Sequence, residues 1–384
     1  MFPEYTAIKD TDVEKQPLVS DYQHGHPCQC GRQQQQRQDQ DRRTRPSKST
    51  IAIFVLILLL FVGYGHNICQ NKHDHYYHPA YTNNDQQQQQ AFEASSSLFS
   101  DLKYCYHHSP LDVHWNGKSA FELGPEITSL SVEQKHDGHR LSAQAGDVVV
   151  VENKKINETK VTFDIRLNDD RSQDAVRIDE SWSKHALDLT VVTNDYDIGN
   201  GCVKIDVLIE VPSSAALDAL TIKFINNDIT IKDKLHLKDF VSASVVSGDL
   251  TVKKPLTSPK ISFSLASGDI TGVFDVDQVE FGAASTSGDV DLDFNRISSA
   301  STIRASTVSG DVNLRLPSDF DSKFDLSVVA GDVKLKAEDA KKLHYRRSGG
   351  IVGRKVNGYY GEDENPSSHI KLDTVSGNLE LKYQ

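Results

Sequence analysis

In the second half of the chain, short stretches alternate strictly between apolar or small residues and polar residues. Val241, Ala243 and Val245 alternate with Ser242 and Ser244, and residues 261–265 and 303–307 repeat the pattern. Alternation with a period of two places every second side chain on one face of a β-strand. The pattern therefore predicts a series of half-buried strands, and signals for helices are weak throughout.

Each predicted strand runs into a short phrase of the type Ser-Gly-Asp. Five copies follow one another at intervals of 20, 20, 22 and 21 residues: Ser247-Gly248-Asp249, Ser267-Gly268-Asp269, Ser287-Gly288-Asp289, Ser309-Gly310-Asp311 and Ala330-Gly331-Asp332. A second alternating strand leaves each phrase, with one lapse at Gly272. A repeat this short cannot bury its own apolar face, so we expect the copies to stack on one another.

Three further phrases fit the same template with changed residues: Ala145-Gly146-Asp147, Asn226-Asn227-Asp228 and Ser376-Gly377-Asn378. The inward positions on the two sides of a phrase, such as Val245 and Leu250, are five residues apart. An unbroken strand would place them on opposite faces, so the chain must turn a corner at each phrase. Gly provides the positive φ that such a corner needs, Asn tolerates it, and Ser and Asp can bind nearby backbone groups.

These corners and strands predict an all-β fold. At roughly 3.3 Å per strand residue, coils of this length hold two or three short strands. We expect a single-stranded β-solenoid resembling a parallel β-helix, with coils of 20–22 residues wound to the right. The alternative is an antiparallel meander in which each phrase is a hairpin loop. The solenoid is favoured because the same residue types recur at every corner, as expected when like residues stack.

The regular spacing fails once. Ala330 and Ser376 are 46 residues apart, which is about two periods. Residues 341–366 within this interval are charged and rich in glycine. We expect one irregular coil or an inserted loop here.

Residues 51–66 form a mainly apolar run without Asp, Glu, Lys or Arg, near the lower end of the length that spans a bilayer. A cleaved signal peptide is the alternative, but fifty residues precede the run and no typical cleavage site follows it. Six Lys or Arg residues lie shortly before the run and only Lys72 lies close after it. This asymmetry predicts a transmembrane signal-anchor with a cytosolic N-terminus, which makes the lipid bilayer a partner of the chain.

Composition divides the remaining chain. Residues 1–50 are polar, with a Gln run and no apolar periodicity, and predict a disordered cytosolic tail. Residues 67–100 are rich in His, Gln and Ser and predict a flexible stalk. Residues 101–384 predict a lumenal or extracellular β-rich domain. Its first half reads as strands without clear repeats, at 129–132, 148–151, 161–167, 187–192 and 203–211.

This orientation exposes two kinds of covalent chemistry to the secretory pathway. Asn157 begins a usable N-glycosylation sequon. Cys69, Cys105 and Cys202 lie on the oxidising side, and an odd number leaves one unpaired. A Cys105–Cys202 disulfide would tie the start of the domain to the strand leading into the repeats and leave Cys69 for an intermolecular bridge. A Cys69–Cys105 disulfide is the alternative.

Other chemistry is weakly indicated. The net charge of −12, without a stripe of Lys or Arg, argues against a nucleic-acid partner. Stacked aspartates could attract cations, but calcium-binding solenoids use a nine-residue repeat that is absent here. The His- and Cys-containing residues 24–30 match no zinc spacing, and the His-rich stalk is more typical of composition than of a site. We expect no cofactor, metal or catalytic residue, because the outward strand positions show no acid and base pair.

Residues 205–212, the serial phrases and the closing residues 370–381 together resemble a family of β-strand-repeat proteins from bacteria and fungi that are described as putative adhesins. The resemblance covers roughly residues 202–384. It implies a single-stranded β-solenoid without an established enzymatic activity.

The sequence thus predicts a non-enzymatic, single-pass type II membrane protein whose solenoid serves as an interaction or structural surface. A cell-surface or cell-wall glycan or a protein is the expected ligand, at the plasma membrane or in the secretory pathway, and self-association is left open. We place any functional surface on the polar strand faces between the corners. The alternatives are a membrane-anchored carbohydrate-active β-helix enzyme and a structural resident of the secretory pathway, which the short span would suit.

Overall fold

The computed structural model describes residues 111–137, 144–194, 202–212, 217–298, 300–350 and 353–384. The predicted tail, transmembrane segment and stalk lie outside these ranges. Within them, no helix is long and apolar enough to cross a bilayer. The described residues instead form two large β-sheets and two short 3-10 helices, η1 (Asp170–Ala175) and η2 (Ala340–Lys342).

The larger sheet, called sheet A, has 14 strands among the described residues. They are β1 (Val113–His114), β2 (Ala120–Leu123), β4 (Gln144–Ala145), β5 (Asp147–Glu152), β6 (Thr159–Leu167), β9 (Val203–Val211), β11 (Asp228–Ile231), β12 (Leu235–His236), β14 (Leu250–Thr257), β16 (Ile270–Asp275), β18 (Val290–Arg296), β20 (Val312–Leu316), β22 (Val333–Ala337) and β26 (Leu379–Tyr383).

The other sheet, called sheet B, has 12 strands in the same described part of the chain. They are β3 (Ser129–Asp137), β7 (Val176–Trp182), β8 (Ala186–Asn194), β10 (Ala219–Phe224), β13 (Phe240–Ser247), β15 (Lys260–Ser267), β17 (Glu280–Ser287), β19 (Thr302–Ser309), β21 (Ser322–Ala330), β23 (Leu343–Gly349), β24 (Arg354–Tyr360) and β25 (His369–Ser376).

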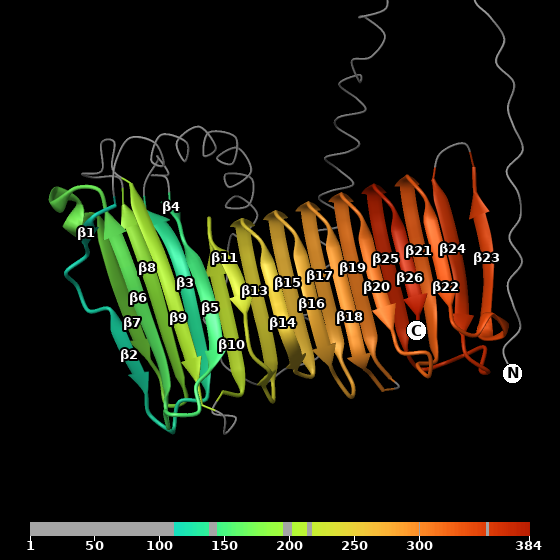
Figure 1. Ribbon diagram of the computed structural model, residues 1–384, viewed down its shortest axis with the longest axis horizontal. Helices are drawn as coiled ribbons and strands as arrows, with labels where there is room; N and C mark the ends of the chain where they lie inside the picture. Colours follow the sequence, from blue (N-terminus) through green and yellow to red (C-terminus); the bar gives the residue numbers. More distant parts are fainter. Residues whose placement is uncertain (1–110, 138–143, 195–201, 213–216, 299, 351–352) are drawn as a thin grey trace, which may run out of the picture. The chain divides into compact units, whose positions relative to one another are not determined.

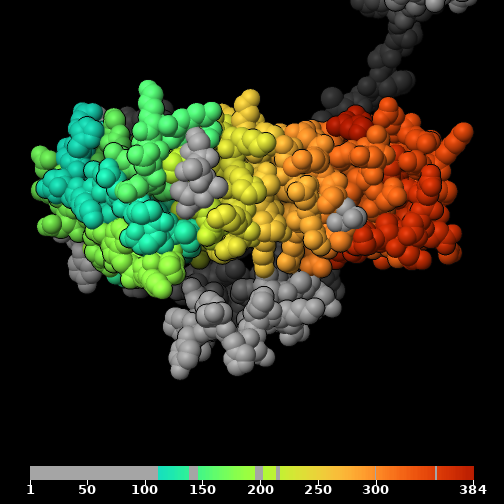
Figure 2. All heavy atoms as spheres, turned by 90° about the horizontal axis from the view of Figure 1, so that it is seen from below, coloured from blue at the N-terminus to red at the C-terminus, as the bar shows by residue number. Residues whose placement is uncertain are grey.

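Each repeat contributes one strand to each sheet, on either side of its corner phrase. In sheet B, β13 pairs with β15, β15 with β17 and β17 with β19, always parallel and with equivalent positions aligned. In sheet A, β14, β16, β18 and β20 also pair in parallel and are aligned next to the phrase, although the register shifts further along β14 and β16. The coils therefore stack as a solenoid, as Figures 1 and 2 show by the order of their colours, and the antiparallel meander is excluded for these repeats.

The core lies between the two sheets and is filled by the inward residues of each alternating strand. Its centre holds four buried phenylalanines from neighbouring coils: Phe263, Phe274, Phe281 and Phe294. The Phe274 ring centroid lies 4.9 Å from that of Phe281 and 5.0 Å from that of Phe294. Gly272, where the apolar pattern lapses, provides the space for this cluster, because a Cβ there would lie 2.5 Å from the Phe274 ring.

Corner glycines permit both the bend and the close stacking of the coils. Gly268, Gly288 and Gly310 have φ values of 128°, 139° and 148°, a region that other L-residues rarely adopt. A Cβ on each of them would lie 2.1 Å from the carbonyl oxygen of the corner residue one coil earlier. Any larger residue would therefore meet both backbone strain and a direct clash.

The Asn227 corner differs from this expectation. Asn227 has no positive φ. Instead its Nδ2 donates a 2.7 Å hydrogen bond to the carbonyl oxygen of Ile205. The side chain thus reaches past the adjacent strand β5 to a backbone group of β9, whereas the other corners have a glycine at this position.

Towards the C-terminus, the stack departs from the order of the sequence. The last coil, β25 and β26, lies between the coil of β19 and β20 and the coil of β21 and β22 (Figure 1). Its residues meet like residues on both sides, since Ser376 aligns with Ser309 and with Ala330. The predicted irregular coil or loop at 341–366 is wrong. Most of this segment is an antiparallel hairpin of β23 and β24 that pairs with β21 and extends sheet B.

The first half of the domain joins the same two sheets. β3 and β8 continue the parallel order of sheet B, whereas β6 and β7 are antiparallel to their neighbours. The indole Nε1 of Trp115 donates to the carbonyl oxygens of Gln173 (3.2 Å) and Val176 (3.1 Å). This contact holds η1 and the loop between β1 and β2 over the N-terminal end of the core.

We predict that Gly288→Ala will lower the free energy of unfolding by about 3 kcal/mol or more, because it combines strain with a backbone clash. Gly282→Ala is the matched control, since Gly282 lies in the preceding strand and no atom lies within 4 Å of the place that its Cβ would occupy. It should change stability by less than about 1 kcal/mol. Urea unfolding of the full chain measures both, and equal effects would contradict the corner argument.

We also predict that deletion of residues 369–384 will destabilise neighbouring strands that remain in the chain. The neighbouring strands β21 and β22 would lose their parallel partners and separate from the stack. Limited proteolysis should then cleave within residues 322–360 at protease levels that leave the full chain intact. Protection of that region in the truncated chain would contradict the internal position of the last coil.

Candidate functional site

The aspartates of the repeated phrases form a ladder of hydrogen bonds along one corner of the stack. At each step a side-chain oxygen accepts a hydrogen bond from the backbone N–H of the residue one coil further. In spatial order, the steps are Asp228 to Asp249 (2.9 Å), Asp249 to Asp269 (2.9 Å), Asp269 to Asp289 (2.7 Å), Asp289 to Asp311 (2.7 Å), Asp311 to Asn378 (2.7 Å) and Asn378 to Asp332 (3.1 Å).

The ladder accounts for the carboxylates of five phrases, those of Asp228, Asp249, Asp269, Asp289 and Asp311. A corner takes backbone N–H groups out of the regular strand pairing, and an ionised carboxylate is a strong acceptor for them. The same contact occurs outside the phrases, where Asp206 Oδ1 accepts from the N–H of Asp147 at 2.9 Å. These five carboxylates are therefore bound to the backbone of their own fold, whereas Asp332 at the end of the ladder contacts Arg354.

Asn378 is the exception that separates two carboxylates. It lies between the coils of Asp311 and Asp332, and its Nδ2 donates to both carboxylate oxygens of Asp311 at 3.2 and 3.3 Å. A neutral amide here keeps the acceptor oxygen for the ladder and adds a donor. It thereby reduces the repulsion between like charges along the corner.

Buried hydroxyl groups form a second contact series at the same corners. The hydroxyls of Ser285, Thr307 and Thr374 donate to the carbonyl oxygens of the preceding corner glycines Gly268 (3.0 Å), Gly288 (2.9 Å) and Gly310 (3.1 Å). These three residues occupy inward positions where other coils have apolar residues. The signal in the sequence was a hydroxyl two residues before the phrase, which alternation alone assigns only to the core.

The other predicted site residues lie apart from the corners. Asn157 is exposed in the loop between β5 and β6, whereas Thr159 of its sequon is 2 % exposed. Cys202 is buried and disulfide-bonded, and its partner lies outside the described residues, as do Cys69 and Cys105. The Cys105–Cys202 pairing stays a prediction.

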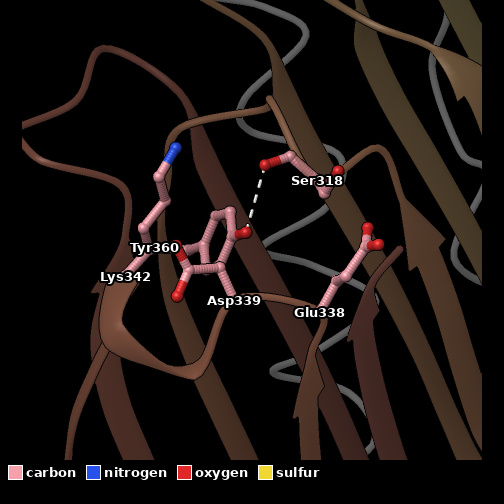
Figure 3. A pocket seen from close by; sticks show the side chains of 5 residues that line it. All are labelled: Ser318, Glu338, Asp339, Lys342 and Tyr360. Atoms are coloured by element: carbon pink, nitrogen blue, oxygen red, sulfur yellow. Dashed lines mark hydrogen bonds between the residues drawn. The ribbon is translucent and has the colours of Figure 1, made fainter.

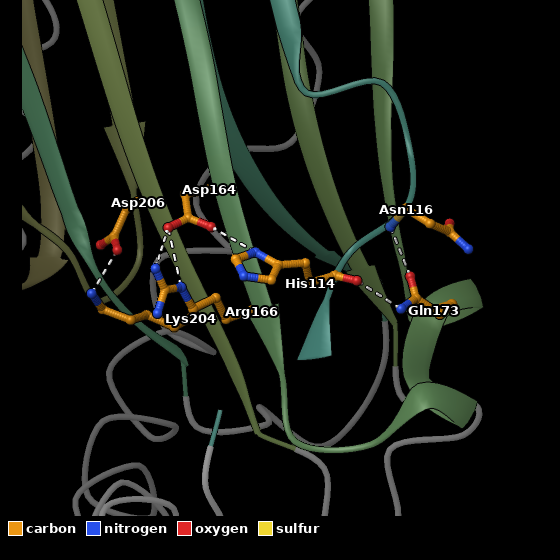
Figure 4. A network of polar contacts seen from close by, with 7 residues as sticks. All are labelled: His114, Asn116, Asp164, Arg166, Gln173, Lys204 and Asp206. Atoms are coloured by element: carbon orange, nitrogen blue, oxygen red, sulfur yellow. Dashed lines mark hydrogen bonds and ion pairs between the residues drawn. The ribbon is translucent and has the colours of Figure 1, made fainter. Parts of the chain in front are cut away.

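Near the N-terminal end, polar residues form a network on the outer face of sheet A (Figure 4). Asp164 accepts hydrogen bonds from Arg166 Nη2 (2.9 Å) and lies 3.3 Å from His114 Nδ1. The Arg166 hydrogen bond is the main cause that lowers the pKa of Asp164, and burial opposes it. Beside it, Lys204 contacts the Asp206 carboxylate that also holds the corner, at 2.5 Å. The Asp164–Arg166 pair lies within β6 and the Lys204–Asp206 pair within β9, whereas the contact between His114 and Asp164 joins β1 to β6.

At the other end, five residues line an open hollow of about 330 Å³: Ser318, Glu338, Asp339, Lys342 and Tyr360 (Figure 3). The Tyr360 hydroxyl donates to the carbonyl oxygen of Ser318 at 3.1 Å, and its ring stacks on Tyr383 at 4.0 Å. Burial and then the Asp339 carboxylate raise the pKa of Tyr360. The hydroxyl is therefore engaged as a hydrogen-bond donor to the backbone at the edge of the hollow.

Carboxylates on neighbouring strands of sheet B also have partners within the fold. Asp325 accepts from His369 Nε2 at 2.9 Å and from the amide of Asn357. Asp373 lies 3.4 Å from Lys371, and burial raises its pKa. In the described part of the chain, no group of three or more His, Cys, Asp or Glu residues is arranged to hold a metal ion.

A family model, described as Toastrack DUF4097, matches residues 147–382. The chain belongs to the Toastrack DUF4097 family. The match begins in the first half of the domain, before residue 202, where the resemblance in the repeats starts. No curated protein matches this toastrack chain.

Solved structures that the chain matches include a "putative cell adhesion protein" from Clostridium sporogenes and a "putative adhesin" from Bacteroides fragilis. Each is 12 % identical to this chain, and each alignment covers 69 % of this chain and 98 % of the other. The TM-scores are 0.30 and 0.36.

We predict that Asp289→Asn and Asp289→Ala will affect the toastrack fold differently. Asn keeps an acceptor for the N–H of Asp311, as Asn378 does in its coil, and should leave the free energy of unfolding nearly unchanged. Ala removes the acceptor and should cost about 1 to 2 kcal/mol. Urea unfolding at neutral pH measures both. Equal losses for the two variants would show that the ladder does not stabilise the corner.

Proposed function

We propose that this toastrack protein is non-enzymatic and presents its stacked sheets as an interaction surface on the outer side of a membrane. The observation that carries the proposal is the corner ladder. The residues with the strongest chemical signal in the sequence, the serial aspartates, are bound to the backbone of adjacent coils. What remains for a partner is the outer surface of the strands.

The outer face of sheet B suits contact with an extended ligand. Its central strands carry small side chains that leave the sheet flat, and Ser262 and Ser264 on β15 are exposed there. Gly282 and Ala284 occupy the aligned positions on β17. A glycan or a protein of a cell surface or cell wall could lie across this face without entering a deep cleft.

Three features support the outer side of a membrane as the location. Cys202 is disulfide-bonded, and disulfides persist mainly in oxidising compartments. The apolar residues 51–66 follow a cluster of basic residues, as in a signal-anchor with a cytosolic N-terminus. The sequon at Asn157 lies on the exposed loop of the same domain.

We expect a C-terminal tag on the full chain to be detected at the surface of intact cells, while an N-terminal tag requires permeabilisation. Asn157→Gln should remove a glycan and increase mobility in denaturing gels. Asn365→Gln is the control, because Pro366 blocks glycosylation there. Detection of the C-terminal tag only after permeabilisation would indicate a resident of the secretory pathway if Asn157 is still glycosylated. A cytosolic C-terminus would refute the orientation.

A further inference from the structure

The two ends of sheet B are strands with one free edge each. β7 pairs only with β8, and β23 pairs only with β24, among the described residues. A free edge presents unpaired backbone N–H and C=O groups that can pair with another strand. Sheet B could therefore be extended at either end.

Each of these edges carries a half-exposed aromatic side chain. Trp182 on β7 is 50 % exposed and Tyr345 on β23 is 48 % exposed. The other large exposed apolar residues in the described chain are aliphatic, Leu208 and Val329. Aromatic side chains and Arg are enriched where proteins bind one another.

The two ends carry opposite charge. Residues 333–355, which include β22 and β23, hold eight Lys or Arg and two Asp or Glu, although the whole chain has a net charge of −12. Residues 169–180, which include η1 and most of β7, hold five Asp or Glu and two Arg. Opposite charges favour the approach of one end to the other end of a second molecule and disfavour contact between equal ends.

The local contacts repeat this complementarity. Trp182 Nε1 donates to Glu180 Oε2 at 3.1 Å, and Glu180 also accepts from Lys118 at 2.8 Å. On the other edge, the Arg347 guanidinium lies over the Tyr345 ring at 5.4 Å. On β7 an aromatic ring thus lies beside an acidic residue two positions away, and on β23 an aromatic ring lies beside a basic residue two positions away.

Both pairs lie on the core-facing side of sheet B. Trp182 and Glu180 align with the buried Leu187 and Leu189 of β8. On β24, the partners of Tyr345 and Arg347 are Gly358 and Val356, which align in turn with the buried Phe324 and Leu326 of β21. In a continued sheet, the two pairs would therefore meet on one face.

The backbone groups of these residues also point outward. Ser183 N–H donates to Ala186 and Gly361 N–H donates to Lys342, so Ser183 and Lys342 direct their backbone groups into the sheet. The direction of the backbone N–H and C=O groups alternates from one residue to the next along a strand. The backbone groups of Trp182 and Glu180 on β7, and of Tyr345 and Arg347 on β23, therefore point toward the free edges.

The strand directions allow a single type of pairing. β23 runs parallel to β21 and hence to the stacked strands of sheet B, whereas β7 is antiparallel to β8 and hence to them. A β23 edge would therefore meet a β7 edge in antiparallel orientation. In the register that places Tyr345 opposite Trp182, Arg347 lies opposite Glu180, because residue numbers rise on one strand as they fall on the other.

We propose that a second copy of this chain docks head to tail, with its β7 paired antiparallel to β23 in this register. The junction stacks Tyr345 on Trp182 and places Arg347 beside Glu180. Because the two surfaces differ, each added copy leaves a free end of either kind, and the contact builds an open row of molecules. The competing interpretation is that the charges on both edges only prevent pairing.

Two charge reversals in the full chain, purified in a mild detergent, test the proposal. Wild-type chain should show a mass that rises with concentration in sedimentation at low salt and falls at about 1 M salt, where the screening length is about 3 Å. Arg347→Glu alone places two acids at the junction and Glu180→Arg alone places two bases there. Each should associate at least about tenfold more weakly than wild type.

The decisive experiment mixes the Arg347→Glu variant with the Glu180→Arg variant. Each junction between unlike variants again joins an acid and a base, so the mixture should recover association that neither variant shows alone. Recovery also shows that both variants are folded. Arg346→Glu is the matched control, with the same charge change on the opposite face of β23, and should weaken association less than Arg347→Glu.

If Glu180→Arg fails to fold beside Lys118, Tyr345→Ala and Trp182→Ala replace it, and each should weaken association by about tenfold. The proposal would be refuted by a wild-type chain that stays monomeric at every concentration and salt level, or that stops at a closed dimer. It would also be refuted if the mixture of the two charge variants did not recover association. The inference goes beyond the proposed function and does not depend on it, because sedimentation reads neither membrane topology nor ligand binding.

Discussion

The structure depends on the close approach of successive coils at their glycine corners. Carbonyl oxygens of one corner occupy the space that a Cβ of the next would need, at 2.1 Å from its position in three successive coils. This contact sets where each strand pair begins, so the strands on both sides of the corner align without register shifts near the phrase. The hydrophobic core then follows from the alternation, because the inward side chains next to each corner meet their counterparts one coil away.

The same constraint explains how an acidic chain tolerates a row of stacked carboxylates. One oxygen of each ladder carboxylate from Asp228 to Asp311 accepts an N–H that the corner leaves without a strand partner, and this hydrogen bond offsets part of the repulsion between neighbours. One position, Asn378, breaks the row with a neutral amide. The corners are thus committed to the stability of the stack.

The alternation and the phrases predicted the strands, their parallel stacking and the positions of the corners, because each of these follows from local periodicity. They could not predict that β25 and β26 lie between two earlier coils. Ser376 aligns with both Ser309 and Ala330, so the phrases alone do not give the order of the coils, and the pairing of β24 with the other edge of β21 has no signal in the repeat. The hydrogen bonds of Thr307 and Thr374 were equally hidden, because a buried hydroxyl on an alternating strand looks like a substitute for an apolar residue.

The internal position of the last coil also determines which strands become the ends of the stack. If the coils were stacked in sequence order, β25 and β26 would form the C-terminal end of the stack. The regularly alternating β25 would then present a row of unpaired backbone groups between short side chains. Instead sheet B ends at β23, with His344, Arg346 and Arg347, and sheet A ends at β22, with Lys334 and Lys336. A parallel stack has no intrinsic stop, since each coil can receive another. The order of coils places the regularly alternating edge inside the fold and leaves a charged edge outside, and charged edges disfavour pairing with an unmatched strand.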